Sequence, residues 1–400
     1  MKMLLKKMAE YDRPQMAKKT GIYPYYHPLE SGQDSEVLIN GKKILMFGSN
    51  SYLGLTNHPK LIEAAKHAID KYGTGASGSR LMNGNLDLHE ELEASLAEFT
   101  GKPASVVFST GFQANLGTVS ALIGRNDFIV MDEKNHASII EGSRLSYAKS
   151  FKFRHNDMIS LEENLKKTDP TQIILIVVDG VFSMEGDIAH LDEICRLAEK
   201  YSASVMVDDA HALGVIGVDG AGTASHFGVT NSVNLIMGTF SKSLASLGGF
   251  VAGDIDTINY LKHNARSLLF SAGIPPASAA VALKALQIIK EEPERREKLW
   301  ENAGYARHLL KRHGFEIGKS QTPIIPIFIG DEQNTFTIAT LLMSQGVYVN
   351  PIIHPAVGKD EAMLRFSLMS THTKEQIDTA ISKLVKSRAM MNGNLSKILA

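Results

Sequence analysis

The sequence contains only one cysteine, Cys195, among 400 residues. A disulfide within the chain needs two cysteines and a cysteine-based zinc site needs several, so both are excluded. Cys195 lies in "LDEICRLAEKY", where the spacing of apolar residues predicts a helix with the thiol facing inward rather than a catalytic cysteine. Groups of His and Asp with the spacing typical of metal ligands are also lacking, and we expect no metal site.

Long apolar runs and an excess of one charge are lacking too. No run approaches the ~18 apolar residues of a membrane-spanning helix. The chain has 42 Lys and Arg against 43 Asp and Glu, so neither a nucleic-acid-binding surface nor an acidic tail is indicated. No internal repeat or low-complexity linker is present. The 44% of hydrophobic residues is typical of a globular protein with a sizeable core.

The N-terminal stretch "MKMLLKKMAEYDRP" alternates Lys with Met and Leu. It lacks the apolar segment and the small-residue cleavage site of a signal peptide. We expect a short amphipathic helix on a cytoplasmic protein, packed against the body of the chain or a partner subunit. Peripheral contact with the inner face of a membrane is the alternative.

Three parts are predicted along the chain. Residues 1–45 form an N-terminal arm that ends in "INGKK", where Asn40-Gly41 indicates a hairpin turn. Residues 46–285 alternate helical patterns with short apolar runs such as "DFIVMD", "IILIVVD" and "SVMVDD". Unbroken apolar runs indicate strands buried on both faces, so we predict a large doubly wound α/β domain with a mainly parallel sheet. Residues 286–400 mix helices and strands in a smaller α+β domain.

One glycine motif is set aside. "GTGASG", Gly73 to Gly78, has the G-x-G-x-x-G spacing of dinucleotide-binding proteins. That motif acts between a strand and a helix, whereas here the preceding "LIEAAKHAIDKYG" has helical spacing. We therefore reject dinucleotide binding and keep a glycine loop near a ligand as the alternative.

Polar residues follow several of the predicted strands. "STGFQAN" places Gly111 and Phe112 where a strand turns into a helix, a position that suits anion binding but also any ordinary turn. His136 follows "DFIVMD", and Asp208 and His211 follow "SVMV". Taken singly, such a His is more often structural, and such an Asp is often a helix cap.

Lys242 completes this set. It lies in "GTFSKSLASLGGF" among small residues, near the hydroxyls of Thr239 and Ser241. Because the strands are parallel, their carboxyl ends meet at one edge of the sheet, where such folds bind ligands. An anion-binding turn, a carboxylate, an imidazole and a lysine are the groups needed to hold pyridoxal 5'-phosphate through its phosphate, ring and aldehyde.

The order of motifs resembles the α-oxoamine synthases. These are fold-type I enzymes that use pyridoxal phosphate to join an amino acid to an acyl-CoA with loss of carbon dioxide. The resemblance covers nearly the whole chain, from "FGSNSYLGL" through "STGFQAN", "DEKNHASI", "VDGVFSMEGD", "VDDAHALGVIG" and "GTFSKSLASLGGF" to "LRFSLMSTHT". It implies a pyridoxal-phosphate-dependent acyltransferase that works as a homodimer, with its sites at the subunit interface.

The resemblance also implies roles for individual residues. Lys242 would hold the cofactor covalently and act as a base, Asp208 would pair with the pyridine nitrogen, and His211 would reach the ring hydroxyl. His136 would stack on the ring and help to position the amino acid. The phosphate would be bound by Gly111, Phe112, Thr239 and Ser241, with Ser271 reaching the partner's phosphate. Arg365 would bind the substrate carboxylate, and Asn50 and Ser183 would be further pocket residues. The family usually has Glu where this chain has Asp209, and we expect little consequence.

Within the family, "GTFSKSLASLGGFVAG" and "GIYPYYHPLESGQDSEV" are most similar to the bacterial branch that condenses L-serine with a long-chain acyl-CoA. The alternatives are sibling synthases that use alanine with pimeloyl-CoA, or glycine with a short acyl-CoA. A cofactor-binding scaffold without catalysis and a structural protein without cofactor belong to other classes. Lys242 and Arg365 together argue against a scaffold, which has no need to bind a substrate carboxylate.

Overall fold

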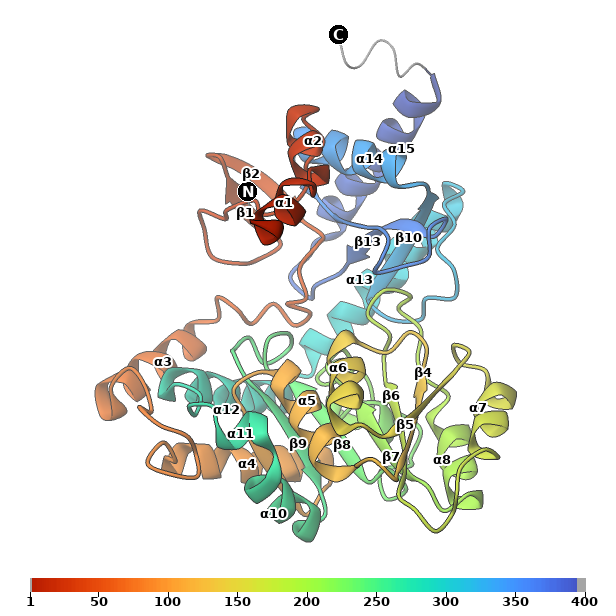
Figure 1. Cartoon of the computed structure of the whole chain (residues 1–400). Coiled ribbons are helices and arrows are strands. Elements are labelled where there is room, and N and C mark those ends of the chain that lie inside the picture. Colours follow the sequence, from red (N-terminus) through yellow and green to blue (C-terminus); the bar gives the residue numbers. More distant parts are fainter. Residues whose placement is uncertain (1, 394–400) are drawn as a thin grey trace. The chain divides into compact units, whose positions relative to one another are not determined.

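The computed structural model describes residues 2–393, which form two compact units (Figure 1). One unit spans Asn50 to Trp300. The other combines the described residues up to Ser49 with those from Glu301 onward. The first unit contains most of the polar residues that the sequence analysis placed at the ends of strands.

A seven-stranded sheet forms the centre of the unit from Asn50 to Trp300. Its strands are β3 (Ala104–Phe108), β4 (Phe128–Asp132), β5 (Lys149–Phe153), β6 (Ile174–Asp179), β7 (Ser204–Asp208), β8 (Leu235–Thr239) and β9 (Gly249–Gly253). The order in the sheet is β3-β9-β8-β7-β6-β4-β5. Neighbours from β8 to β5 run parallel, whereas β9 is antiparallel to both β8 and β3. The predicted mainly parallel sheet is confirmed.

Helices cover both faces of this sheet, which is why its strands are apolar throughout. One face packs against α5 (Gly111–Leu122), α6 (Ala137–Ser146), α10 (Ile255–Asn264) and α11 (Arg266–Leu269). The other face packs against α7 (Met158–Leu165) and α8 (Leu191–Lys200). In β6, Leu175 and Val177 face the first group of helices, and Ile174, Ile176 and Val178 face the second.

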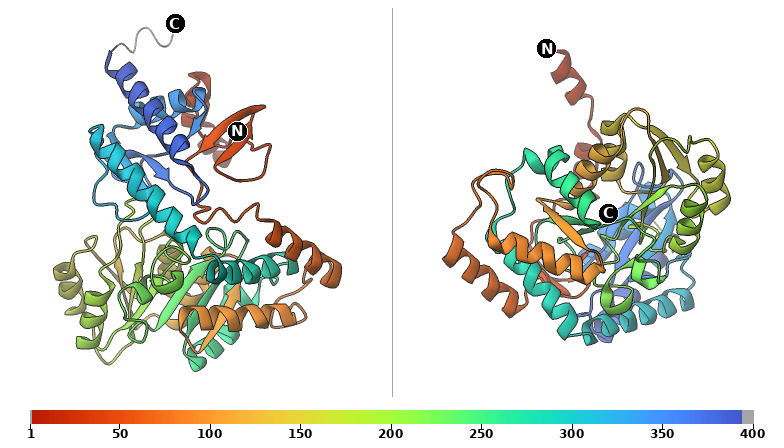
Figure 2. Two further views of the ribbon diagram at one scale, coloured as in Figure 1. Left: turned by 180° about the vertical axis from the view of Figure 1, so that it is seen from behind. Right: turned by 90° about the horizontal axis from the view of Figure 1, so that it is seen from below.

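The remaining elements of this unit are mainly helical. Figure 2 shows α12 (Pro276–Glu291) beside α4 (Asp87–Thr100), and α12 also contacts α3 (Pro59–Tyr72). Two single turns, the 3₁₀ helix Val218–Gly220 and α9 (Thr223–His226), follow β7. After α12, the helix α13 (Glu294–Arg312) begins directly beyond Pro293. The "GTGASG" motif directly follows helix α3 and not a strand. This agrees with the rejection of dinucleotide binding.

The other unit joins the two ends of the chain. β1 (Glu36–Ile39) and β2 (Lys42–Met46) form the predicted hairpin, and β11 (Val347–Tyr348) adds parallel to β2. Asn40 and Gly41 have φ values of 50° and 69°, which suits a two-residue hairpin turn. A second, antiparallel sheet contains β10 (Ile324–Gly330), β13 (Ala362–Ser367) and β12 (Asn350–Ile352).

The described helices of this unit are α1 (Met3–Ala9), α2 (Arg13–Lys19), α14 (Glu332–Ser344) and α15 (Lys374–Gly393), together with the part of α13 from Glu301 onward. The N-terminal helix expected from the sequence is thus present as α1, and none of its residues is buried. Between residues 2 and 393, no helix combines the length and the apolar character needed to cross a bilayer.

Candidate active site

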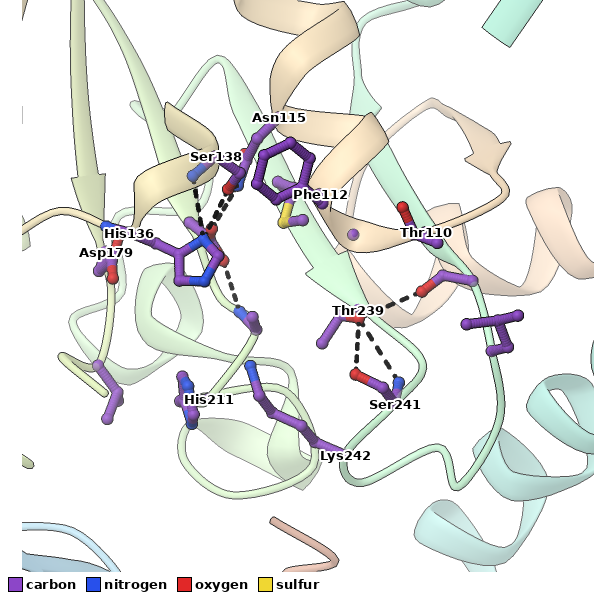
Figure 3. Close-up of a pocket in the computed structure, with 17 residues that line it drawn as sticks. Thr110, Phe112, Asn115, His136, Ser138, Asp179, His211, Thr239, Ser241 and Lys242 are labelled. Atoms are coloured by element: carbon purple, nitrogen blue, oxygen red, sulfur yellow. Dashed lines mark hydrogen bonds between the residues drawn. The ribbon is translucent and has the colours of Figure 1, made fainter. Parts of the chain in front are cut away.

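A cavity of 290 Å³ lies at the carboxyl ends of β6, β7 and β8. Its lining includes eight of the residues that the sequence singled out: Gly111, Phe112, His136, Asp208, His211, Thr239, Ser241 and Lys242. Figure 3 shows the side chains of His136, His211 and Lys242 directed toward the same space. The structure therefore brings together residues that are up to 131 positions apart, from Gly111 to Lys242.

The sheet explains why these side chains meet. Side chains alternate between the faces of a strand, so Asp208 lies on the same face as Met206, and Thr239 on the same face as Met237. Both methionines pack toward α5 and α6. Lys242 lies three residues beyond the last residue of β8, in the turn that leads to β9.

The N-terminus of α5 forms one end of the cavity. Thr110 caps the helix, since its Oγ1 accepts a hydrogen bond of 3.1 Å from the backbone N–H of Gln113. A Cβ at Gly111 would lie 2.9 Å from Thr239 Oγ1, so only glycine permits this close approach. The hydroxyls of Thr239 and Ser241 lie 3.1 Å apart. Backbone N–H groups and two hydroxyls thus converge where a phosphate would be stabilised.

Asp208 lies deeper in the cavity and is only 4% exposed. Its Oδ2 accepts a hydrogen bond of 2.6 Å from Asn115 Nδ2, and its Oδ1 accepts one of 2.9 Å from the backbone N–H of Ala210. These donors hold the carboxylate in one orientation. A buried carboxylate of this kind can keep a pyridine nitrogen protonated.

His136 ends the connection between β4 and α6 and caps α6. Its Nδ1 lies 2.7 Å from Ser138 Oγ and accepts a hydrogen bond of 3.3 Å from the backbone N–H of Ser138. Burial lowers the pKa of His136 and the nearby Lys242 acts in the same direction, while Asp208 opposes them. A neutral, fixed imidazole suits stacking on an aromatic ring.

His211 is fixed by Tyr52, which the sequence reasoning did not single out. Tyr52 Oη and His211 Nδ1 lie 2.7 Å apart, and Tyr52 is 1% exposed. Asn115, Ser138 and Asp179 were missed as well, although each also lines the cavity. Tyr52, Asn115 and Ser138 lie inside the motifs "FGSNSYLGL", "STGFQAN" and "DEKNHASI" but not at strand ends, so only the motifs themselves could have indicated them.

Asp179 is a second carboxyl group beside Asp208, since the two residues are paired in the register of β6 and β7. Burial and the charge of Asp208 raise the pKa of Asp179 well above its usual range. Its Oδ1 accepts a hydrogen bond of 3.2 Å from the backbone N–H of His136. Two adjacent buried carboxyls do not both ionise readily, which is the physical reason for the raised pKa of Asp179.

Four predicted residues are not among the described residues that line the cavity: Asn50, Ser183, Ser271 and Arg365. Asn50 Oδ1 accepts a hydrogen bond of 3.4 Å from Tyr52, and Ser271 Oγ accepts one of 3.1 Å from Gln113. Ser183 lies in the turn after β6. Arg365 belongs to β13 in the other unit, is 4% exposed, and donates a hydrogen bond of 2.7 Å to Ser367 Oγ. Their assigned roles stay predictions.

The donor set of the cavity fits pyridoxal phosphate. The helix N-terminus with two hydroxyls suits the phosphate, and the buried Asp208 suits the pyridine nitrogen. The imidazole of His136 suits the ring face, and the amine of Lys242 suits the aldehyde. Gly111 lets the N-terminus of α5 lie close to the hydroxyl of Thr239, since a Cβ there would be 2.9 Å from that oxygen, and this brings the backbone N–H groups and the hydroxyl together for an anion.

Sequence comparison assigns the chain to a family: it belongs to aminotransferase class I and II, whose model matches residues 42–384. A serine palmitoyltransferase from Sphingobacterium spiritivorum is 56% identical, with 96% of each chain covered. An 8-amino-7-oxononanoate synthase from Thermoanaerobacter pseudethanolicus is 44% identical, with 94% of this chain and 95% of the relative covered.

A solved structure of serine palmitoyltransferase from S. paucimobilis, with bound pyridoxal phosphate and myriocin, has a TM-score of 0.95. It is 32% identical, and 98% of this chain and 100% of that chain are covered. The resemblance to the α-oxoamine synthases and the fold-type I class are thereby confirmed, and so is pyridoxal phosphate as the cofactor.

Proposed function

We propose that the chain catalyses the decarboxylating condensation of L-serine with palmitoyl-CoA to 3-oxosphinganine, with release of carbon dioxide and CoA. The reaction class is carried by one observation, the cavity that unites Lys242, Asp208 and the anion cradle of α5. The choice of substrates is supported by 56% identity to a serine palmitoyltransferase, against 44% to a sibling synthase.

Pyridoxal phosphate, when bound, supplies the electron sink that makes the α-carbon of an amino acid nucleophilic. Lys242 Nζ would hold the cofactor covalently, and as a free amine it would be the base that takes the α-proton of the amino acid. Asp208 would keep the pyridine nitrogen protonated, and His211 would hold the ring hydroxyl. His136 would stack on the ring and position the amino acid, and Arg365 would bind its carboxylate.

We also propose a homodimer with sites at the subunit interface. Phe270 is 75% exposed and Met82 is 78% exposed, and their loops are joined by a bridge between Ser79 and Ala272. Exposed apolar side chains in neighbouring loops are typical of an interface. Ser271, next to Phe270, would then reach the partner's phosphate. Sedimentation that finds only monomers at micromolar concentration would contradict this assignment.

A cytoplasmic location belongs to the same proposal, with α1 in contact with the inner face of the membrane. Met3, Leu4, Leu5 and Met8 are all more than half exposed, and Lys6 and Lys7 share the helix. Basic helices with exposed apolar residues bind anionic lipid surfaces. The full chain should therefore sediment with vesicles of anionic lipid but not with neutral ones, and a variant lacking residues 2–9 should sediment with neither.

The substrate proposal is tested by a spectral titration of the purified protein with amino acids. L-Serine should give a saturable change in the cofactor spectrum, and carbon dioxide should appear only when long-chain acyl-CoA is added. Preference for alanine with pimeloyl-CoA, or for glycine with a short acyl-CoA, would show that the chain is a sibling synthase instead. A bound cofactor whose spectrum responds to no amino acid would favour the non-catalytic scaffold.

A further inference from the structure

A buried chain of hydrogen bonds connects His136 with Asp208. His136 Nδ1 lies 2.7 Å from Ser138 Oγ, which lies 2.8 Å from Asn115 Nδ2. The same nitrogen of Asn115 donates to Asp208 Oδ2 at 2.6 Å. Ser138 and Asn115 are 0% and 1% exposed, so these groups have little access to water. Neither residue belongs to the roles proposed above.

The directions of these hydrogen bonds are fixed by chemistry. An ionised carboxylate only accepts hydrogen bonds, so Asn115 must turn its amide nitrogen rather than its oxygen toward Asp208. That nitrogen also lies beside Ser138 Oγ, which must accept a hydrogen bond from it. The hydroxyl proton of Ser138 is then left to point at His136 Nδ1.

A second donor meets the same ring nitrogen. The backbone N–H of Ser138 lies 3.3 Å from His136 Nδ1 and can only donate. If Nδ1 carried a proton, its N–H would face two other donors, the hydroxyl and the backbone N–H of Ser138. Buried donors without an acceptor are costly in free energy. Nδ1 must therefore offer its lone pair, and any ring proton of a neutral His136 must be on Nε2.

We infer that Asn115 and Ser138 are positioning residues that hold His136 neutral, with its proton on Nε2. The ring then presents a hydrogen-bond donor at Nε2. Three other charged or titratable groups face His136: Asp208 at the end of β7, Lys242 after β8, and Asp179 at the end of β6, which accepts from the backbone of His136. Burial and Lys242 favour the neutral ring, and Asp208 alone favours the charged one.

The inference concerns residues of this chain and does not depend on the identity of the substrates. It can be tested by nitrogen NMR of the full-length protein labelled in histidine, after removal of the cofactor and again after reloading with pyridoxal phosphate. His136 is identified by the signal that disappears in His136→Gln. The nitrogen shifts of each ring distinguish the two neutral tautomers from the charged form.

Two variants sharpen the test. Ser138→Ala removes the hydroxyl donor, and the ratio of the Nε2–H to the Nδ1–H tautomer should fall about fivefold, as expected for the loss of one hydrogen bond. Ser143→Ala is the matched control, because Ser143 is another buried serine of α6 whose hydroxyl contacts Ser150 instead. It should leave the His136 signals unchanged.

Asn115→Ala leaves Ser138 without the donor that orients it and should lower the tautomer ratio in the same direction. Thr118→Ala, at another buried position of α5, is its control. A His136 that carries its proton on Nδ1, or is charged at pH 7, would overturn the inference. So would a tautomer ratio that Ser138→Ala leaves unchanged or that Ser143→Ala shifts equally. None of these outcomes would affect the proposed reaction, which the spectral titration tests separately.

Discussion

Lys242 lies in a turn between β8 and β9 that is built largely from small residues, so its amine reaches a cavity that bulkier neighbours would fill. Lys242→Ala should abolish turnover and the covalent attachment of pyridoxal phosphate while the fold remains intact, because no other lysine is among the described residues that line the cavity. Absorbance after borohydride treatment, together with mass spectrometry, measures attachment. Lys290→Ala, at a surface ion pair with Glu98, is the control. Retained activity in pure Lys242→Ala protein would remove Lys242 from its role.

Asp208 is a buried carboxylate of the cavity, and the backbone N–H of Ala210, which donates to Oδ1, would still orient an amide oxygen at that position. Asp208→Asn should therefore bind the cofactor but lose most exchange of the serine α-proton, since an amide does not keep the pyridine nitrogen protonated. Proton NMR of L-serine in deuterated water measures this exchange. Exchange close to that of the unmodified protein would show that another group pairs with the nitrogen.

Arg365 is assigned to the substrate carboxylate by resemblance alone. Arg365→Ala should weaken serine binding by tenfold or more, about 1.4 kcal/mol, and leave acyl-CoA binding nearly unchanged. Arg365→Lys keeps the charge but not the paired N–H groups. Its affinity for serine should therefore lie between that of the unmodified protein and that of Arg365→Ala. Separate titrations with serine and with acyl-CoA measure both affinities, and thermal unfolding checks that the buried substitution preserves the fold. Equal loss of both affinities would contradict the assignment.

At the scale of elements, the N-terminus of α5 is expected to bind the phosphate. Gly111→Ala should weaken binding of pyridoxal phosphate at least tenfold, because the new Cβ would lie 2.9 Å from Thr239 and displace its hydroxyl. Gly124→Ala, just beyond the other end of α5, is the matched control, since its Cβ would meet only Asp127 at 3.8 Å. Equilibrium dialysis measures both. Unchanged affinity in Gly111→Ala would place the phosphate elsewhere.

A buried ion cluster holds the loops that lead to His136. His155 lies between Asp132 at 3.1 Å and Asp187 at 3.0 Å. Burial alone would lower the pKa of His155, but the hydrogen bonds and charges of the two carboxylates raise it to about 10. Its charged form therefore stabilises the folded state fully below pH 6.5, and this contribution is lost as pH rises through about 10.

The free energy of unfolding should thus fall between pH 7 and 10 by an amount that is absent in His155→Asn. Urea unfolding at several pH values measures this difference, which should be on the order of a few kcal/mol. His263→Asn replaces a more exposed histidine at the end of α10 and should keep the pH dependence of the unmodified protein. Parallel pH profiles for the unmodified chain and His155→Asn would contradict the role of the cluster.

Most strands of the seven-stranded sheet were predictable from the sequence, and the strands that were not predicted have physical reasons for their weak patterns. Apolar runs indicated β3, β4, β6, β7 and β8 because strands buried on both faces carry no alternation. The edge strand β5, "KSFKF", is half polar and half exposed, so its pattern is weak. β9 contains two glycines, which weaken its strand pattern. Gly249 must be glycine because a Cβ there would lie 2.6 Å from the backbone of Gly111.

At the scale of the site, the sequence indicated most of the polar residues at strand ends, though not Asp179 at the end of β6, and it did not indicate the residues that hold them. Lys242, Asp208 and His136 stand out by type and place. Asn115 and Ser138 lie within helices, where polar residues are common, and their partners are distant in the sequence. Only the packing of α5 and α6 on the same face of the sheet brings them together.

At the scale of the whole molecule, the sequence showed an N-terminal arm but not its partner. The arm hairpin pairs through β2 with β11, about 300 residues away, and such distant pairing leaves no local signal. The three-part division at residues 45 and 285 stays a prediction. The vesicle experiment tests whether α1, at the start of the arm, binds a membrane surface.

The whole enzyme should also discriminate acyl-CoA chains by length. Each buried methylene contributes about 0.8 kcal/mol, so a site that buries the chain should favour long chains steeply. Rates with acyl-CoA substrates of increasing length should rise by roughly fourfold per methylene until the site is filled. Equal rates for short and palmitoyl chains would contradict burial of the chain.

The proposed pair of substrates, L-serine and palmitoyl-CoA, is tested by product analysis with mass spectrometry. The purified protein with pyridoxal phosphate is offered L-serine, L-alanine and glycine, each with palmitoyl-CoA, pimeloyl-CoA and a short acyl-CoA. We expect 3-oxosphinganine from L-serine and palmitoyl-CoA as the main product, and none with Lys242→Ala. A product formed only from alanine with pimeloyl-CoA, or from glycine with a short acyl-CoA, would contradict it.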